Sequence, residues 1–312
     1  MKVVLAAEES AGTQMLRALA QSQHQVVAVL TEPPKPGSTR VSLWNAAQSL
    51  GLETLPADQV TNPALADRLR SDGVDIFLNV HSLYVIHDDV LAAPRLGAFN
   101  LHPGPLPRYA GLNVVSWAIF RGEQNHGVTV HRIEPRIDAG PIVYQSSFPI
   151  HEEDTALSLS FKCVREGITL LLRLLEVAAA GETIPSITQD LASRQYFGRD
   201  VPEGGCISWQ WPAAKVVNFI RACDYLPFAS PWGHPQALLG VQKLAVVRAR
   251  KTGIDCHIPP GTVGDVTDSG ATVACGDQWI LATKLRLDGR CLPAQALLKP
   301  GDRLAEVKDL LT

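Results

Sequence analysis

Residues 99–113, FNLHPGPLPRYAGLN, combine side chains that can do chemistry with residues that fix the backbone. Asn100 and His102 are two apart, so on a strand their side chains point to the same face. The prolines at 103, 105 and 107 then fix φ and interrupt both strand and helix. One interpretation is a Pro-rich connection with a hydrogen-bonded histidine, and the other is a stiff loop that presents an Asn/His pair.

A second stretch, RIDAGPIV, favours the functional interpretation. It places Asp138 in a tight turn between two predicted strands. Asn, His and Asp supply a neutral hydrogen-bond donor, a titratable base and a carboxylate. In acyl transfer to an amine, Asn100 would stabilise the developing oxyanion and His102 would take the amine proton. Asp138 would hold His102 or shuttle protons.

The sequence lacks the motifs of other common α/β functions, namely nucleotide binding, metal binding and nucleophilic catalysis. The turn after the first predicted strand reads AAEESAGTQML, with one glycine and two carboxylates, which excludes the usual dinucleotide and P-loop patterns. The histidines form no H-E-x-x-H, and His126 and His131 are five apart, on opposite faces of a strand. No G-x-S-x-G nucleophile elbow is present. We therefore expect no metal site and no nucleophile of that type.

The elements that must position these residues alternate between strand and helix. Apolar runs such as KVVLAA, QVVAVLTE and DIFLNV are separated by helical segments, which predicts βαβ units and a mainly parallel, Rossmann-like sheet. Two longer strands follow residue 122, then a long amphipathic helix that ends near Gly181. Short β runs near the C-terminus indicate a small, barrel-like (OB-like) domain. The predicted boundaries are 1–183, a linker at 184–205, and 206–312.

The composition is that of a chain with two ordinary globular cores. The 312 residues are 46% hydrophobic, the net charge is −3, and the six cysteines are scattered without a framework. No global basic field attracts nucleic acid or membrane, and no apolar stretch approaches the length of a membrane span. We expect a soluble, cytoplasmic protein with reduced thiols.

The two motifs together resemble the 10-formyltetrahydrofolate-dependent formyltransferase family. The resemblance lies in the segments FNLHPGPLPRYAGLN and HGVTVHRIEPRIDAGPIV. Two further segments, GTVGDV and CGDQWILATKLRLDG, resemble the small C-terminal barrel of methionyl-tRNA and amino-sugar formyltransferases. The resemblance implies Asn100, His102 and Asp138 as the catalytic set and 10-formyltetrahydrofolate as the formyl donor.

The same resemblance implies where the pterin of the donor would bind. It lies against the segment that corresponds to HSLYVI and against the loop leading into the Asp138 turn, held largely by backbone groups. We therefore assign Leu83, Tyr84, Ile86 and Gly140 to folate binding. Ordinary packing at a strand end is the alternative for the side chains of the HSLYVI segment.

The acceptor amine is the open question. Members that act on transfer RNA carry a Gly-Arg-Gly-Lys-Lys loop where this chain has TEPPKPGSTRVSL, whose only basic residues are Lys35 and Arg40. They also have SLLPRWRGAAP where this chain has GPLPRYAGLN. The basic strand VVRARK could contact RNA or be a solvated strand face. These differences favour a small-molecule primary amine, with a nucleotide-linked amino sugar as the best single candidate.

Several alternatives stay open. Tyr109 and Asn113 would line the acceptor side, although a loop tyrosine can equally pack on its own prolines. Methionyl-tRNA formyltransferase is the second candidate, followed by formylation of an amino acid or siderophore precursor. A hydrolase that releases formate and a silent folate-binding protein are further readings. The sequence defines no oligomeric state and is compatible with a homodimer.

Overall fold

The computed structural model describes residues 1–34 and 42–307, so Lys35 and Arg40 of the segment TEPPKPGSTRVSL lie outside the described residues. The chain forms two compact units that interleave along the sequence. The first comprises 1–111, 127–148 and 162–196, and the second comprises 112–126, 149–161 and 197–312. The domain boundaries at 183 and 206 stay a prediction.

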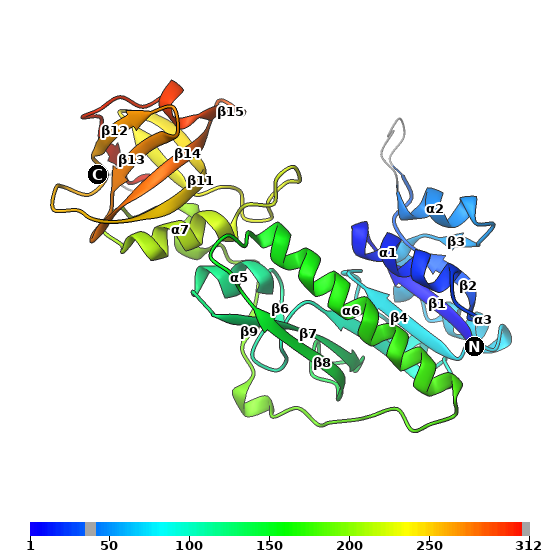
Figure 1. The fold of residues 1–312 in the computed structure, drawn as a ribbon. Coiled ribbons are helices and arrows are strands. Elements are labelled where there is room, and N and C mark those ends of the chain that lie inside the picture. The colour runs from blue at the N-terminus through cyan, green and yellow to red at the C-terminus, as the bar shows by residue number, and fades with distance from the viewer. Residues whose placement is uncertain (35–41, 308–312) are drawn as a thin grey trace. The chain divides into compact units, whose positions relative to one another are not determined.

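The first unit is built on a seven-stranded sheet with the order β3-β2-β1-β4-β5-β7-β8 (Figure 1). The strands are β1 (Lys2–Ala7), β2 (Gln25–Leu30), β3 (Thr54–Leu55), β4 (Ile76–Val80), β5 (Gly97–His102), β7 (Asn125–Arg132) and β8 (Ile142–Pro149). The pairs from β3 to β5 are parallel, whereas β5 and β7 are antiparallel. This confirms the expected mainly parallel, Rossmann-like sheet.

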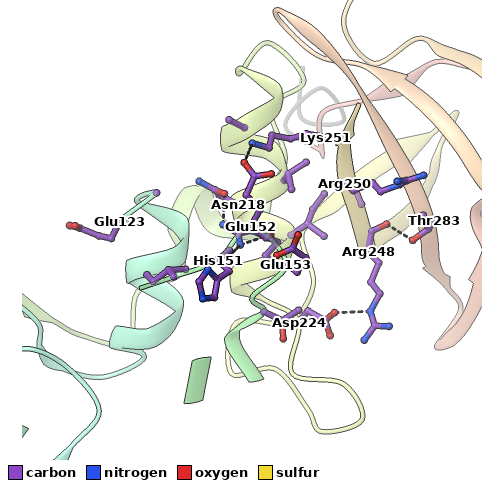
Figure 2. Close-up of a pocket in the computed structure, with 18 of the residues that line it drawn as sticks. Glu123, His151, Glu152, Glu153, Asn218, Asp224, Arg248, Arg250, Lys251 and Thr283 are labelled. Carbon is purple, nitrogen blue, oxygen red and sulfur yellow. Dashed lines mark hydrogen bonds and ion pairs between the residues drawn. The ribbon is translucent and has the colours of Figure 1, made fainter. Parts of the chain in front are cut away.

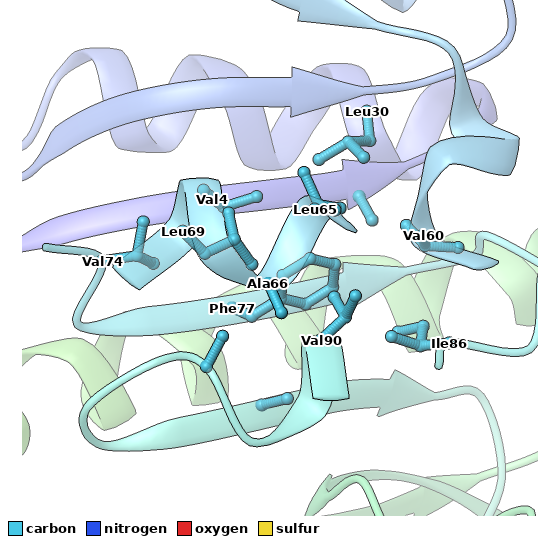
Figure 3. Packing of buried hydrophobic residues seen from close by; sticks show 13 residues of the cluster. Val4, Leu30, Val60, Leu65, Ala66, Leu69, Val74, Phe77, Ile86 and Val90 are labelled. Atoms are coloured by element: carbon cyan, nitrogen blue, oxygen red, sulfur yellow. The ribbon is translucent and has the colours of Figure 1, made fainter. Parts of the chain in front are cut away.

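Helices cover this sheet because its strands are apolar on both faces. They are α1 (Glu9–Ala20), α2 (Leu43–Ser49), α3 (Ala64–Ser71), α4 (Asp88–Leu91) and α6 (Ala156–Ala179). On one face, Phe77 of β4 is fully buried in a cluster with Leu65, Leu69 and Val90 of the helices (Figure 3). Against β5, α6 packs so closely that a Cβ at Gly167 would overlap the side chain of Leu101. The central strands are therefore rigidly held where they deliver the site residues.

The second unit contains a curled antiparallel sheet with the order β12-β13-β14-β11-β10-β16, and β15 pairs with β14 (Figure 1). Its strands are β10 (Gln236–Leu239), β11 (Gln242–Asp255), β12 (Val263–Thr267), β13 (Gly270–Ala274), β14 (Gln278–Leu287), β15 (Arg290–Pro293) and β16 (Leu304–Ala305). Register shifts along β11 and β14 accompany the curl. The expected barrel-like C-terminal sheet is confirmed.

Two helices and a two-stranded pairing complete the fold. The second unit contains α5 (Val114–Phe120) and α7 (Ala213–Ala222), and β6 (Ala110–Gly111) pairs with β9 (Tyr196–Phe197). Single 3₁₀ turns lie at Ala57–Thr61, Leu191–Ser193, Pro202–Gly205 and Ala294–Ala296. Within residues 1–34 and 42–307, no helix has the length and apolarity needed to cross a bilayer.

Candidate active site

Asn100 and His102 lie at the carboxyl end of β5, on one face of the strand. In register, Asn100 is opposite Asn79 of β4 on one side and opposite His131 of β7 on the other. His102 is buried, whereas Asn100 is half-buried. Ligands of open α/β sheets bind at this edge, so the strand order alone brings four polar side chains to the expected position.

The ring of His102 has different partners at its two nitrogens. Nε2 lies 2.5 Å from the carbonyl oxygen of Tyr109, and Nδ1 lies 3.6 Å from Oδ2 of Asp138. Because a carbonyl can only accept, Nε2 carries the proton in the neutral ring. The free lone pair is therefore at Nδ1, on the side of Asp138.

Asp138 is fixed by the loop that follows β7. The residue has φ 52°, and its Oδ2 accepts a hydrogen bond of 2.8 Å from the backbone N–H of Gly111. Its other carboxylate oxygen lies 3.5 Å from Nε2 of His131. Gln189 donates to the carbonyls of Asp138 and Gly140, at 3.1 and 2.6 Å, which holds the turn from behind. The carboxylate is thus directed at two histidines.

Burial and charge set the protonation of this pair. Burial lowers the pKa of His102, and the opposite influence of Asp138 only partly offsets it. Burial works to raise the pKa of Asp138, but its polar neighbours, chiefly His102 and then the Gly111 N–H, outweigh burial and hold it well below its ordinary value. At neutral pH the site therefore contains an ionised carboxylate beside a neutral imidazole, which is a base that can accept a proton at Nδ1.

The Pro-rich loop is anchored by one buried hydroxyl. Thr129 Oγ1 on β7 accepts from the N–H of Leu106 at 3.2 Å and from Nε2 of Gln145 at 2.8 Å, and it donates to the carbonyl of Gly104 at 2.7 Å. A Cβ at Gly104 would lie 2.7 Å from the Tyr109 carbonyl that also receives the His102 proton. Only glycine permits this close approach.

The residues predicted to bind folate divide into two kinds. Leu83 and Tyr84 lie on the loop after β4, where Leu83 is 80% exposed, whereas Ile86 is buried in the core beneath it. The hydroxyl of Tyr84 donates to Glu32 at 2.5 Å, and this hydrogen bond raises the pKa of the phenol. Gly140 passes so close to the carbonyl of Arg132 that a side chain there would overlap it. Their role in binding folate stays a prediction.

The two residues predicted on the acceptor side lie in different units. Tyr109 is only 2% exposed and contributes its carbonyl to His102. Asn113 precedes α5 in the second unit, with φ 54°. The structure therefore brings Asn100, His102 and Asp138 together with the backbone of Tyr109. It places Asn113 in another compact unit, and the acceptor role of both residues stays a prediction.

Sequence reasoning missed three residues of this site: Asn79, His131 and Gln189. Asn79 Nδ2 donates to Oδ1 of Asn100 at 2.9 Å, and Asn100 Nδ2 lies 3.1 Å from Nε2 of His131. A polar residue in the middle of the apolar run DIFLNV was a usable signal for Asn79. His131 was considered only as a metal ligand, because its pairing opposite Asn100 depends on the antiparallel β5–β7 register.

A cavity of about 1000 Å³ lies within the second unit, lined by residues 122–124 after α5, residues 150–155, α7, β11 and Thr283 of β14 (Figure 2). None of the predicted site residues lines it. Two ion pairs lie along its lining: Arg248 with Asp224 at 2.8 Å, and Lys251 with Glu152 at 2.6 Å. Among the residues that the structure describes, no group of three His, Cys, Asp or Glu side chains could hold a metal ion.

Comparison with solved structures identifies proteins with the same fold. An N-formyltransferase from Helicobacter canadensis, solved with folinic acid and dTDP-3-aminofucose, matches with 21% identity and a TM-score of 0.69 over 90% of this chain and 98% of that chain. WlaRD, a sugar 3N-formyltransferase solved with dTDP and 5-N-formyl-THF, matches with 21% identity and a TM-score of 0.70 over 90% and 97%. HypX from Aquifex aeolicus, solved with tetrahydrofolic acid, matches with 18% identity and a TM-score of 0.67 over 96% of this chain and 47% of the HypX chain.

Family models give the assignment. The formyl transferase model matches residues 1–175, and the model of the C-terminal domain of formyl transferases matches residues 201–300. The first match includes both motifs of the candidate site and spans more than half of the 312 residues. The chain therefore belongs to the formyl transferase family.

Proposed function

We propose that this protein transfers a formyl group from 10-formyltetrahydrofolate to the primary amine of a nucleotide-linked amino sugar. The observation that carries the proposal is the meeting of Asn100, His102 and Asp138 at the ligand-binding edge of the sheet, within a member of the formyl transferase family. The donor and the acceptor are the parts that need experiment.

Asn100 supplies a hydrogen-bond donor for the oxygen that gains negative charge. Its Nδ2 carries two N–H bonds, and one of them is directed at His131. The second remains for an oxyanion, and such a donor contributes roughly 10²–10³ in rate. The donor molecule, when bound, supplies an activated formyl carbon at which this charge develops.

His102 and Asp138 handle the proton of the amine. The free lone pair of His102 is at Nδ1, because Nε2 is committed to the Tyr109 carbonyl. When Nδ1 takes a proton, the new N–H faces Oδ2 of Asp138, 3.6 Å away. The carboxylate then stabilises the imidazolium, which makes His102 a stronger base at the moment of proton transfer. The proton would then pass to the folate nitrogen as its bond to the formyl carbon breaks, so that tetrahydrofolate leaves as a neutral amine and His102 returns to the neutral ring.

Exposed apolar side chains near the site fit a flat pterin ring. Leu83 and Val85 are 80% and 67% exposed on the loop after β4, and Ile137 is half-exposed immediately before Asp138. These two loops leave the sheet next to Asn100, and exposed apolar side chains of this kind are typical of ligand sites. Leu83, Tyr84, Ile86 and Gly140 would hold the ring through packing and backbone groups.

The acceptor is proposed from the similar solved structures and from charge. Two of them are N-formyltransferases solved with dTDP or a dTDP-linked amino sugar, and this chain spans nearly their whole length. The turn after β1 carries Glu8 and Glu9 instead of a glycine-rich phosphate loop. We therefore expect the diphosphate of the acceptor to bind away from this turn. The acceptor role of Asn113, and that of Tyr109, whose side chain is buried, stays a proposal.

Transfer RNA is a poorer fit as acceptor. A protein that grips RNA needs several free cations for phosphates. On β11, the strand with the VVRARK sequence, Arg248 and Lys251 already pair with carboxylates of the same unit. The methionyl-tRNA alternative is therefore not favoured. The amino-acid alternative is not favoured because two of the similar structures were solved with dTDP or a dTDP-linked amino sugar.

An acceptor panel tests the proposal. Purified protein is incubated with 10-formyltetrahydrofolate and, separately, with dTDP-linked 3-amino and 4-amino sugars, a set of amino acids, or methionyl-tRNA, and the products are read by mass spectrometry. We expect the N-formyl product only with a nucleotide-linked amino sugar. Formylation of methionyl-tRNA, accompanied by a salt-sensitive shift of labelled tRNA in a gel, would contradict the proposed acceptor while leaving formyl transfer intact.

A further inference from the structure

A continuous hydrogen-bonded row crosses three neighbouring strands at the candidate site. Asn79 on β4 donates from Nδ2 to Oδ1 of Asn100 on β5, at 2.9 Å. Nδ2 of Asn100 in turn lies 3.1 Å from Nε2 of His131 on β7. All three residues are aligned by the strand register, so the row is part of the sheet and does not depend on a loop.

Backbone carbonyls at both ends fix the direction of the row. Nδ2 of Asn79 also donates to the carbonyl of Ser82, at 3.2 Å, and Nδ1 of His131 lies 2.9 Å from the carbonyl of Arg132. A carbonyl only accepts, so the amide nitrogen of Asn79 must face Ser82, and Nδ1 must carry the proton of neutral His131. In the Asn79–Asn100 contact the donor is then Nδ2 of Asn79, and in the Asn100–His131 contact it is Nδ2 of Asn100.

We propose that Asn79 is the positioning residue that sets the amide orientation of Asn100. By donating to Oδ1, Asn79 keeps the oxygen of Asn100 on the β4 side and both N–H bonds on the other. One N–H is used by His131, and the second faces the reacting oxygen. If the amide of Asn100 were flipped, Oδ1 would replace Nδ2 beside the reacting oxygen and would repel the oxyanion. The inference rests on the proposed function, because it assigns Asn100 to the oxyanion.

The unpaired oxygen of Asn79 supports this role. Asn79 is buried, and its Oδ1 has no hydrogen-bond partner among the described residues. A buried acceptor without a partner destabilises a fold, and an apolar side chain of the same shape avoids that cost. Asparagine at this position is explained by its two donated hydrogen bonds, one to Asn100 and one to Ser82.

Two substitutions of nearly the same shape separate orientation from packing. Asn79→Leu removes the donors, and His131 alone then orients Asn100, so we expect kcat to fall about 3–10-fold. Asn79→Asp, assayed at alkaline pH, replaces the donor with an acceptor and turns the amide over, so we expect a loss of about 10², as for a missing oxyanion donor. Both changes also remove the hydrogen bond to the carbonyl of Ser82, in the proposed folate segment, so any rise in KM for the formyl donor should be common to the two variants and only kcat should separate them.

The tautomer of His131 gives a readout that needs no turnover. With wild-type protein and Asn79→Leu, ¹⁵N NMR should show His131 protonated at Nδ1. In Asn79→Asp the flipped Asn100 presents its oxygen to Nε2 while the carbonyl of Arg132 still holds the proton on Nδ1, so His131 should carry protons on both nitrogens. Phe77→Leu, a change on the same strand whose side chain lies in the apolar cluster, is the control for general perturbation of β4.

The outcomes are distinct. The proposal is supported if kcat decreases from wild type to Asn79→Leu to Asn79→Asp and if His131 gains a proton at Nε2 in Asn79→Asp. It is overturned if Asn79→Asp is more active than Asn79→Leu, if both losses follow the folded fraction as in Phe77→Leu, or if Nε2 of His131 stays unprotonated in Asn79→Asp. Failure of the proposed function itself would appear separately, as an Asn100→Ala variant with undiminished turnover.

Discussion

At the scale of residues, the site is defined by which nitrogen of each histidine is already committed to a backbone carbonyl. The carbonyl of Tyr109 accepts a hydrogen bond from Nε2–H of His102, which leaves Nδ1 as the basic atom facing Asp138. The carbonyl of Arg132 accepts from Nδ1–H of His131, which leaves Nε2 as an acceptor for Asn100. The two histidines therefore have different roles, because backbone carbonyls select opposite tautomers.

The pH dependence of the reaction follows from the pKa of His102. Catalysis needs the neutral ring, so activity is lost as the pH falls through this pKa. Burial lowers it, and the acid limb of kcat/KM should therefore have its midpoint below the ordinary histidine value of about 6.5. Asp138 opposes burial, so Asp138→Asn should move the limb to still lower pH while reducing the maximal rate by about 10².

This prediction is checked by pH profiles of kcat/KM for the acceptor, measured for the wild type and Asp138→Asn at saturating formyl donor. Disappearance of the acid limb in the variant would show that the carboxylate, and not the imidazole, is the group whose protonation stops the reaction, because asparagine does not titrate. Asp190→Asn, a surface change on the 3₁₀ turn at Leu191–Ser193, is the control and should leave the profile in place.

At the scale of elements, the rigidity of the Pro-rich loop comes from β7 as much as from its own prolines. Thr129 supplies a hydroxyl that is bonded to Leu106, Gly104 and Gln145 in the interior of the unit. The loop thus cannot shift without leaving buried polar groups unpaired. Through Gly104 and Tyr109, the same loop positions the carbonyl that selects the tautomer of His102.

Thr129→Val should therefore affect both stability and rate. The substitution keeps the shape but removes the hydroxyl, so the N–H of Leu106 and the carbonyl of Gly104 lose their partner. We expect the free energy of unfolding to fall by about 3 kcal/mol and kcat to fall by about tenfold. Chemical denaturation and steady-state kinetics measure these two quantities.

Thr129→Ser is the matched control, because it keeps the hydroxyl and loses only a methyl group. It should retain most of the rate and most of the stability. If Thr129→Val were as stable and as active as Thr129→Ser, the loop would be held by its prolines alone.

Much of this fold was predictable from the sequence, and its limits have physical reasons. Apolar runs identified the parallel strands, and the residue types at 100, 102 and 138 identified the candidate set. The antiparallel β5–β7 register was not predictable, because it depends on pairing between segments that no local pattern links. His131 and the row through Asn79 depend on that register, and were missed with it.

At the scale of the whole molecule, the net charge is small and ion pairs form within a single unit. The net charge is −3, and the basic residues Arg248 and Lys251 on β11 are neutralised within their own unit. The large cavity of that unit is lined by these paired charges and by none of the predicted catalytic residues. The two family models match 1–175 and 201–300, and the proposed chemistry belongs to the first.

The most direct test of the central claim is the rate of formyl transfer by His102→Ala, measured beside the wild type and beside His257→Ala as an exposed-histidine control. Formation of the N-formyl amino sugar from 10-formyltetrahydrofolate is followed under saturating conditions, and folding is checked by circular dichroism. We predict that His102→Ala folds normally and loses at least about 10² in kcat, while His257→Ala matches the wild type. Turnover by His102→Ala close to the wild-type rate would contradict the assignment of His102 as the catalytic base.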